Sequence, residues 1–293
     1  MNPLIRAAAT LLVCLVAAGA QAQTAFYEAA PAELPGLPGS IIRSERMAFG
    51  PIGGDAWRLL YRSTDPGRRP IVVSGVVVLP HGATPPGGRP IVAWGHPTTG
   101  VVPACAPSLA HFVFQQMSGL RQFIDVGYIV AATDYPGLGT PGPHPFLDGA
   151  SEGRAVLDMI RATKAFLGPQ AGSRAALWGH SQGGQAVLFA AELAPHYAPE
   201  LDLAGVAAAA PATDLAALMH DDLGTGGGDN LLAMTLWSWS RLHDLPLAGV
   251  VIPSAVPAMD ALADICLESP VDILPRRSLC EQLEKGFLAD PDF

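Results

Sequence analysis

Residues 179–183 have the types and the spacing needed for nucleophilic chemistry. They read Gly179, His180, Ser181, Gln182 and Gly183. In this G-x-S-x-G pattern a serine stands at a sharp strand-to-helix turn, which exposes its hydroxyl and turns the next backbone amide toward a developing oxyanion. Glycine is needed on both sides because the turn leaves no room for a Cβ atom. The pattern therefore predicts Ser181 as a nucleophile and Gln182 as the donor of one oxyanion amide.

The context of this pattern decides its meaning, because glycine is abundant in the chain, with 32 residues, and short motifs also arise by chance. Residues 175–178 form an apolar run that predicts a buried strand, and residues 184–193 predict a helix. That order favours a nucleophile elbow over a plain glycine-rich turn. His180 is expected to pack beside Ser181, since it is too close in sequence to act as its base.

The elements around the elbow alternate between strands and helices. Apolar runs predict strands over residues 57–63, 71–80, 90–94, 128–134 and 203–210. Helical spacing occurs over residues 109–123, and a further helix is expected to begin with Ser151 as its cap. This alternation predicts an α/β protein with a mostly parallel sheet, covered by helices on both faces. The strand over 203–210 is expected to lie beneath helices, and residues 23–56 to form an extended N-terminal arm.

The alternation stops at about residue 214. Residues 224–228 are rich in glycine and predict a mobile loop, and Trp237 and Trp239 stand among leucines. Residues 214–293 therefore predict a mostly helical cap above the core, which we assign to residues 23–213. The two indole rings could line an acyl pocket, and packing in a small helical core is an equal alternative.

The composition and the N-terminus restrict the class of protein. Hydrophobic residues make up 49% of the chain and charged residues 15%, which excludes a disordered chain. The 26 acidic residues outnumber the 17 basic ones, so nucleic acid is not expected as a partner. No segment after the N-terminal apolar run reaches 18 apolar residues, so stable membrane insertion is not expected either. Arg6, the apolar run over 7–18 and an A-x-A site at 20–22 predict a signal peptide over residues 1–22 and a secreted or periplasmic protein. A retained N-terminal anchor is the alternative.

Three cysteines remain once the signal peptide is removed: Cys105, Cys266 and Cys280. In an oxidising compartment they predict one disulfide, and nothing in their surroundings supports a catalytic thiol.

Two other motifs favour structural interpretations. Residues 137–142 fit G-x-G-x-x-G, but prolines within and around them predict a rigid loop and not a dinucleotide site. His220, Asp221 and Asp222 could ligate a metal, although a solvated turn is favoured. We therefore expect no metal and no cofactor.

Several further stretches match a known family in order: Tyr61-Arg62-Ser63-Thr64, Ala93-Trp94-Gly95-His96-Pro97-Thr98-Thr99-Gly100, Cys105-Ala106-Pro107-Ser108 and Asp134-Tyr135-Pro136-Gly137-Leu138-Gly139. With the elbow, they make the chain resemble the secretory lipase family of α/β-hydrolases, in particular its bacterial members, from about residue 27 to the end. The resemblance implies an α/β-hydrolase fold with a helical cap after the sixth strand. It also implies a secreted serine lipase or carboxylesterase that acts on triacylglycerols or shorter acyl esters without a cofactor.

The resemblance also assigns individual residues. Ser181 matches the nucleophile, and Gln182 should supply one oxyanion amide. The second amide should come from the loop after the strand over 91–94, where Thr98 is the candidate. Cys105 matches the disulfide cysteine of the family, with Cys266 as the favoured partner and Cys280 as the alternative.

The triad partners of Ser181 are where the chain departs from the family. This fold carries Asp or Glu and then His after the serine, on loops that follow later strands. The later histidines are His196, His220 and His243, and none of them follows a strand and a carboxylate. We therefore expect a C-terminally incomplete sequence that lacks the last strands and the triad Asp and His, and that is nearly inactive as given. A triad of His243 with Asp221 or Asp222 is the alternative.

Two other functions stay open from the sequence. A truncated chain could be an inactive remnant or a binding module. A complete enzyme of the same fold could act on peptides, antibiotics or polyesters instead of acyl esters or lipids. The sequence leaves acyl chain preference and oligomeric state open.

Overall fold

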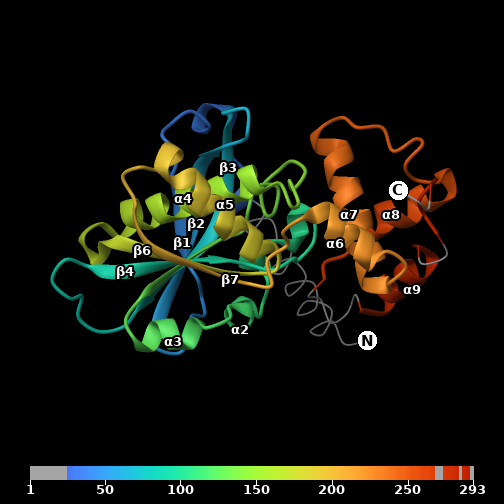
Figure 1. The fold of residues 1–293 in the computed structure, drawn as a ribbon. Coiled ribbons are helices and arrows are strands. Elements are labelled where there is room, and N and C mark those ends of the chain that lie inside the picture. Colours follow the sequence, from blue (N-terminus) through green and yellow to red (C-terminus); the bar gives the residue numbers. More distant parts are fainter. Residues whose placement is uncertain (1–24, 268–272, 284–285, 291–293) are drawn as a thin grey trace, which may run out of the picture.

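The computed structural model describes residues 25–267, 273–283 and 286–290 (Figure 1). The signal peptide expected over residues 1–22 lies outside this part of the chain. The sheet has the strand order β1-β2-β3-β5-β4-β6-β7. Its strands are β1 (Ile41–Arg46), β2 (Gly54–Thr64), β3 (Pro70–Pro80), β4 (Arg89–Gly95), β5 (Ile129–Thr133), β6 (Ala171–His180) and β7 (Asp202–Ala209).

The sheet is mixed, with a parallel and an antiparallel half. Strands β5, β4, β6 and β7 are parallel neighbours, as the alternation of strands and helices predicts. Strands β1, β2 and β3 continue the sheet in antiparallel fashion, and β3 pairs with β5. The short connection between β2 and β3 allows only a hairpin, whereas parallel neighbours need long crossovers. The parallel half carries the elbow.

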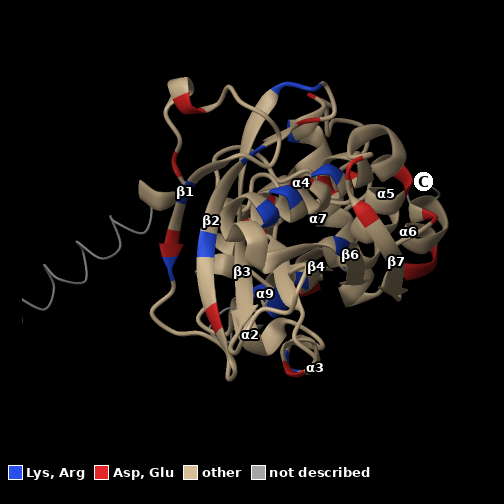
Figure 2. Ribbon diagram, turned by 90° about the vertical axis from the view of Figure 1, so that its left-hand side faces the viewer, with Lys and Arg blue, Asp and Glu red and all other residues tan. Residues whose placement is uncertain are grey.

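Part of the segment expected to be an extended arm belongs to the sheet. Strand β1 pairs with β2, and two ion pairs join the strands across this edge: Arg58 with Glu45 at 2.7 Å and Arg46 with Asp55 at 2.5 Å. Figure 2 shows these alternating charges on the outer strands. Pairing satisfies backbone groups that a free arm would leave to water.

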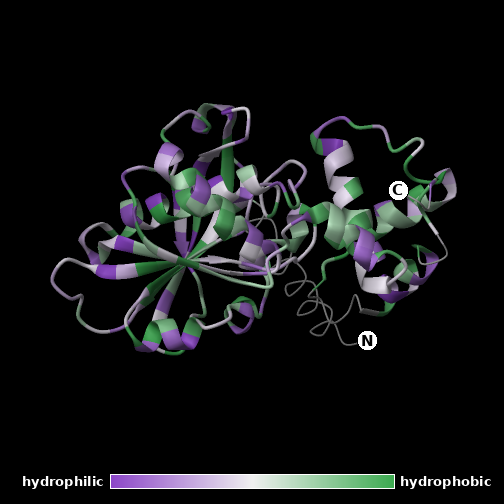
Figure 3. Ribbon diagram, in the orientation of Figure 1, coloured by the Kyte–Doolittle hydropathy of each residue, from purple (hydrophilic) through white to green (hydrophobic). Residues whose placement is uncertain are grey.

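Helices cover both faces of the sheet. Helices α4 (Gly149–Leu167) and α5 (Gln182–Tyr197) lie on one face, and α2 (Val113–Gln116) and α3 (Leu120–Asp125) on the other (Figure 1). The apolar core fills both layers and appears as green strands and helix faces in Figure 3.

The prediction of Ser151 as the N-cap residue of α4 was wrong. Asp148 is the N-cap residue, and its carboxylate accepts a hydrogen bond from the Ser151 backbone N–H at 2.8 Å. Short 3-10 helices are η1 (Pro31–Glu33), η2 (Pro103–Cys105), η3 (Pro107–Leu109), η4 (Gly168–Gln170) and η5 (Pro253–Ala255).

Strand β7 differs from its expected burial. Its sequence is small and apolar, but its central residues are exposed, with Val206 at 38%. The reason is its position at the end of the sheet order, where it pairs with β6 alone among the strands described. Apolar composition predicted the strand correctly but not its burial.

The residues after β7 form a separate helical layer. Helices α6 (Leu215–Asp222), α7 (Gly226–Leu242), α8 (Val256–Ala263) and α9 (Ile273–Leu283) gather beside the C-terminal ends of the parallel strands (Figure 1) around an apolar cluster of their own. The glycine-rich stretch expected to be a loop instead begins α7, because the Thr225 hydroxyl accepts a hydrogen bond from the Gly228 N–H at 3.0 Å. No helix in the described part of the chain is long and apolar enough to cross a membrane.

Candidate active site

Ser181 is the single residue between β6, which ends at His180, and α5, which begins at Gln182. Its backbone has φ 56° and ψ −121°, a region that residues other than glycine rarely adopt. Hydrogen bonds hold it there: its N–H donates to Ala209 O at 2.9 Å, and its carbonyl accepts from Gln185 N and Ala212 N. The half-buried side-chain hydroxyl makes no hydrogen bond to any residue that the structure describes. A strained backbone thus presents an uncommitted hydroxyl at the start of a helix.

The two glycines of the motif are required by close backbone contacts. A Cβ atom on Gly179 would lie 2.0 Å from the Gly183 carbonyl oxygen. A Cβ atom on Gly183 would lie 2.0 Å from the Gly95 carbonyl oxygen and 2.7 Å from that of His96. The end of β4 therefore touches the first turn of α5, which brings the loop after β4 beside the elbow.

Both expected oxyanion donors lie at this junction. Gln182 is the first residue of α5, and such an N–H has no intrahelical acceptor. The positive end of the helix favours negative charge at the same place. Thr98 lies half-buried in the loop after β4, and within the described ranges its N–H donates to no other residue. Two uncommitted amides on touching segments could stabilise an oxyanion.

Contacts on both sides fix the loop that carries Thr98. The His96 ring is buried, with Nδ1 2.7 Å from Pro97 O and Nε2 3.1 Å from Asp134 O. Burial lowers the pKa of His96 to about 4. On the other side, the Leu267 N–H donates to Thr99 O at 2.8 Å. The cap segment therefore reaches the loop directly.

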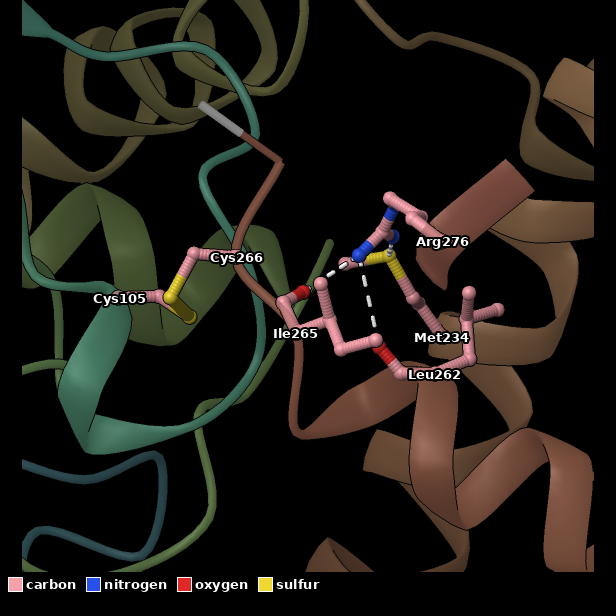
Figure 4. Close-up of a disulfide and its surroundings, with 6 residues drawn as sticks. All are labelled: Cys105, Met234, Leu262, Ile265, Cys266 and Arg276. Atoms are coloured by element: carbon pink, nitrogen blue, oxygen red, sulfur yellow. Dashed lines mark hydrogen bonds between the residues drawn. A yellow bond between two sulfur atoms is a disulfide. The ribbon is translucent and has the colours of Figure 1, made fainter. Parts of the chain in front are cut away.

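A disulfide joins the core and the cap beside this contact. It links Cys105 to Cys266, the pair that the resemblance favoured (Figure 4). Gly100 passes so close that a Cβ atom there would lie 2.4 Å from Cys105 Sγ. Figure 4 also shows Arg276 of α9 donating to the carbonyl oxygens of Leu262 and Ile265, just before Cys266.

The Gln182 side chain points into the protein and contacts two buried residues that the sequence analysis did not single out. Gln182 Nε2 lies 2.7 Å from Glu152 Oε1 and 2.9 Å from His144 Nε2. All three side chains are almost completely buried. Nothing in their spacing signals this contact, because the three residues come from α4, α5 and the loop before α4.

The histidines and carboxylates of the alternative triad are not brought to Ser181. Among the described histidines, none hydrogen-bonds to its hydroxyl, and His180 is exposed. The histidines that follow in sequence are exposed on α5, on α6 and at the end of α7: His196, His220 and His243. In the part of the chain described, His243 has no hydrogen bond or ion pair with Asp221 or Asp222. The described residues also contain no group of three or more His, Cys, Asp or Glu placed to hold a metal ion.

A cleft of about 520 Å³ lies at the junction of core and cap. Its walls come from the start of α4, the outer face of α5, the start of α6 and the end of α7, and include Leu147, Gln185, Leu188, Phe189, Leu215, Trp239 and His243. Trp239 lines it while its Nε1 donates to Phe146 O at 2.8 Å. Trp237 instead packs within the cap, where its Nε1 donates to Asp260 and the Arg241 guanidinium lies 3.9 Å from the ring centre. The two tryptophans thus have different environments.

A lipase family model matches this chain, and so do curated relatives that are lipases. The family model described as Secretory lipase matches residues 108–233. Lipase A of Arthroderma benhamiae is 30% identical over 219 residues, which are 67% of this chain and 45% of that protein. The secreted triacylglycerol lipase LIP4 of Malassezia globosa is 32% identical over 197 residues, which are 62% of this chain and 42% of that protein. The chain spans less than half the length of these relatives.

Solved structures share the fold. Candida antarctica lipase A in its closed state superimposes with a TM-score of 0.71 at 21% identity, covering 91% of this chain and 64% of that one. The rice cell wall degrading esterase LipA from Xanthomonas oryzae gives 0.69 at 20% identity, covering 87% and 74%. The sheet with its flanking helices is therefore an α/β-hydrolase fold, as the resemblance implied.

Proposed function

Because the chain belongs to the secretory lipase family, we propose that it is a secreted serine carboxylic-ester hydrolase that acts through an acyl-enzyme on Ser181. The conformation of Ser181 carries the proposal. Its positive φ and the two touching glycines lift an uncommitted hydroxyl to the N-terminus of α5. The same turn leaves the Gln182 amide without an acceptor, beside the loop of Thr98.

The proposed reaction uses these groups in two steps. Ser181 Oγ attacks the ester carbonyl carbon, and the negative charge on the carbonyl oxygen is stabilised by the N–H groups of Gln182 and of the Thr98 loop. The alcohol leaves after taking up a proton, and water then cleaves the acyl-serine to the carboxylic acid. The Oγ proton needs a base, usually a histidine held by a carboxylate, and losing triad members costs roughly 10⁴ to 10⁶ in rate.

The substrate class follows from the family and from the surface near the elbow. The names of the relatives include a triacylglycerol lipase, and one structural neighbour is named as an esterase. The cleft between core and cap has leucine, phenylalanine and tryptophan in its walls, and its lining reaches Gln185, one turn along α5 from Ser181, but does not include Ser181 itself; such apolar walls suit an acyl chain. We therefore propose acyl esters, including triacylglycerols, as substrates. The signal peptide proposed over residues 1–22 would direct the protein out of the cytoplasm.

Hydrolysis of a series of p-nitrophenyl esters, with acyl chains of two to sixteen carbons, tests the proposal. A matched set of peptide p-nitroanilides provides the comparison. In the full-length gene product, where a base serves Ser181, we expect release of p-nitrophenol that depends on chain length, no cleavage of the anilides, and no ester turnover by Ser181→Ala. Equal ester turnover by the Ser181→Ala variant would overturn the assignment, and cleavage of the anilides alone would overturn the substrate class.

A further inference from the structure

The side chain that follows the nucleophile is anchored inside the protein. Gln182 is 1% exposed, and a buried amide must find hydrogen-bond partners or carry a large desolvation cost. Its Nε2 has two, Glu152 Oε1 and His144 Nε2. Since the backbone N–H of Gln182 is the proposed oxyanion donor, whatever fixes this side chain also fixes that donor.

The protonation of His144 determines the direction of these hydrogen bonds. Its Nδ1 lies 2.9 Å from Pro136 O, which can only accept, so Nδ1 carries the proton. Burial lowers the pKa of His144 to about 3, so the ring is neutral and Nε2 presents a lone pair. Gln182 Nε2 must therefore donate one hydrogen to His144 and the other to Glu152. The amide cannot be turned the other way without facing its oxygen toward that lone pair.

Glu152 connects the elbow to the loop before α4. Its Oε1 accepts from Gln182 Nε2 at 2.7 Å and from the Leu147 backbone N–H at 3.0 Å. Among the described residues, the imidazole that lies near it is the neutral His144, at 3.7 Å, and Asp148 adds negative charge. Burial raises the pKa of the Glu152 carboxyl well above its usual value. Its contacts are thus hydrogen bonds to the elbow and the loop, not an ion pair.

The same loop is held by the cap. The Ser238 hydroxyl of α7 donates to His144 O at 2.6 Å and accepts from the Phe146 N–H at 3.1 Å. Trp239 Nε1 donates to Phe146 O. The path from α7 through residues 144–147 to Gln182 is continuous, so the cap and the oxyanion end of α5 are held by one hydrogen-bonded segment.

We propose that Glu152 is a positioning residue that, together with His144, fixes the Gln182 side chain and thereby sets the Gln182 backbone N–H in the oxyanion hole. The inference rests on the proposed ester hydrolase function. Glu152 does not touch the substrate, so its removal should reduce kcat and leave KM largely unchanged.

Two substitutions at position 152 separate positioning from general loss of structure. In Glu152→Gln the amide oxygen can still accept from Gln182 and Leu147, and kcat for p-nitrophenyl butyrate should stay within about fivefold. In Glu152→Leu no acceptor remains, and kcat should fall by roughly 10²-fold, the lower end of the loss on removing an oxyanion donor, with KM changed less than threefold. Equal kcat for the Leu variant and the unsubstituted protein would overturn the proposal.

A double variant keeps the test valid if Glu152→Leu folds poorly. Glu152→Leu leaves the Leu147 N–H, one Gln182 amide hydrogen and the already unpartnered Gln182 Oε1 without partners. Glu152→Leu with Gln182→Leu leaves the Leu147 N–H and His144 Nε2, so the double variant should regain part of the lost thermal stability. If Glu152 acts through Gln182, the double variant should keep the roughly 10²-fold loss in kcat of Gln182→Leu alone, without a further loss. Recovery of kcat together with stability would show a merely structural role. Ser181→Ala separates the two claims, because residual turnover by that variant would refute the function itself.

Discussion

Substitution of Gly183 by alanine tests the elbow at its most crowded point. The added Cβ atom would lie 2.0 Å from the Gly95 carbonyl oxygen, whereas real Cβ atoms essentially never approach closer than 3.0 Å, so the backbone must shift by about 1 Å. The obstructing atoms are backbone atoms of Gly95 and His96 and cannot rotate away. Overpacking of this kind costs about 1–3 kcal/mol, and we expect about 3 kcal/mol here because only backbone can yield. A displacement of that size at the reacting groups also lowers the rate by roughly 10²-fold.

The matched control is Gly205→Ala in β7, where a Cβ atom would meet nothing within 4 Å. Alanine is favoured over glycine in a strand interior by roughly 0.5–1 kcal/mol, so this variant should be as stable as the parent or slightly more stable. Urea unfolding followed by circular dichroism measures the free energy of unfolding of both variants. The rate of fluorophosphonate labelling measures the reactivity of Ser181 in each. If Gly183→Ala matched Gly205→Ala in both measurements, the tight elbow described above would be refuted.

Three further predictions concern the disulfide, the buried histidines and the cap of α4. Replacing Cys105 and Cys266 by serine should lower the free energy of unfolding by up to about 5 kcal/mol, the chain-entropy value for a closed loop of 161 residues; an unchanged urea midpoint would contradict this. Burial lowers the pKa values of His96 and His144 to about 4 and about 3. The unfolded state therefore binds protons that the folded state does not, so stability falls progressively as the pH is lowered from 6.5, and this loss levels off below about 4 for His96 and about 3 for His144. NMR should show neither ring titrating between pH 5 and 8, and a midpoint near 6.5 for either would refute the buried neutral state. Asp148→Ala should cost about 1 kcal/mol in urea unfolding by removing the N-cap of α4, while Asp148→Ser should retain most of that stability.

The sequence predicted the parts of the fold that leave a local signal. Continuous apolar runs marked the parallel strands, and the G-x-S-x-G motif marked the turn at Ser181. Gly179 is required by a contact with Gly183 four positions away, whereas Gly183 is required by a contact with Gly95, which only the folded sheet brings close. Local signals failed where distant partners decide the outcome. Residues 41–46 joined the sheet because β2 offers them a partner. β7 is exposed because, among the described strands, it pairs with β6 alone, which its composition does not encode. Ser151 and Asp148 are both good cap residues, and only the backbone geometry distinguishes them.

In the candidate site, too, the sequence predicted the residues of the local motif but not the contacts between residues far apart in the chain. Ser181 and the Gln182 amide follow directly from the motif. The anchor of the Gln182 side chain does not, because His144 and Glu152 are 38 and 30 positions away in sequence and meet it only after the loop before α4 folds over α5. A buried polar side chain carries no periodic pattern that marks it as buried. The contact of Leu267 with Thr99 is likewise set by the position of the cap.

The most direct test of the central claim is to identify the residue that a serine-directed probe modifies. The protein would be incubated with a fluorophosphonate, digested, and mapped by mass spectrometry, with Ser181→Ala treated in parallel. We predict one phosphonylated peptide, containing residues 179–183 and modified on Ser181, and none in the variant. Labelling that is equal in Ser181→Ala, or that falls on another serine, would contradict the account.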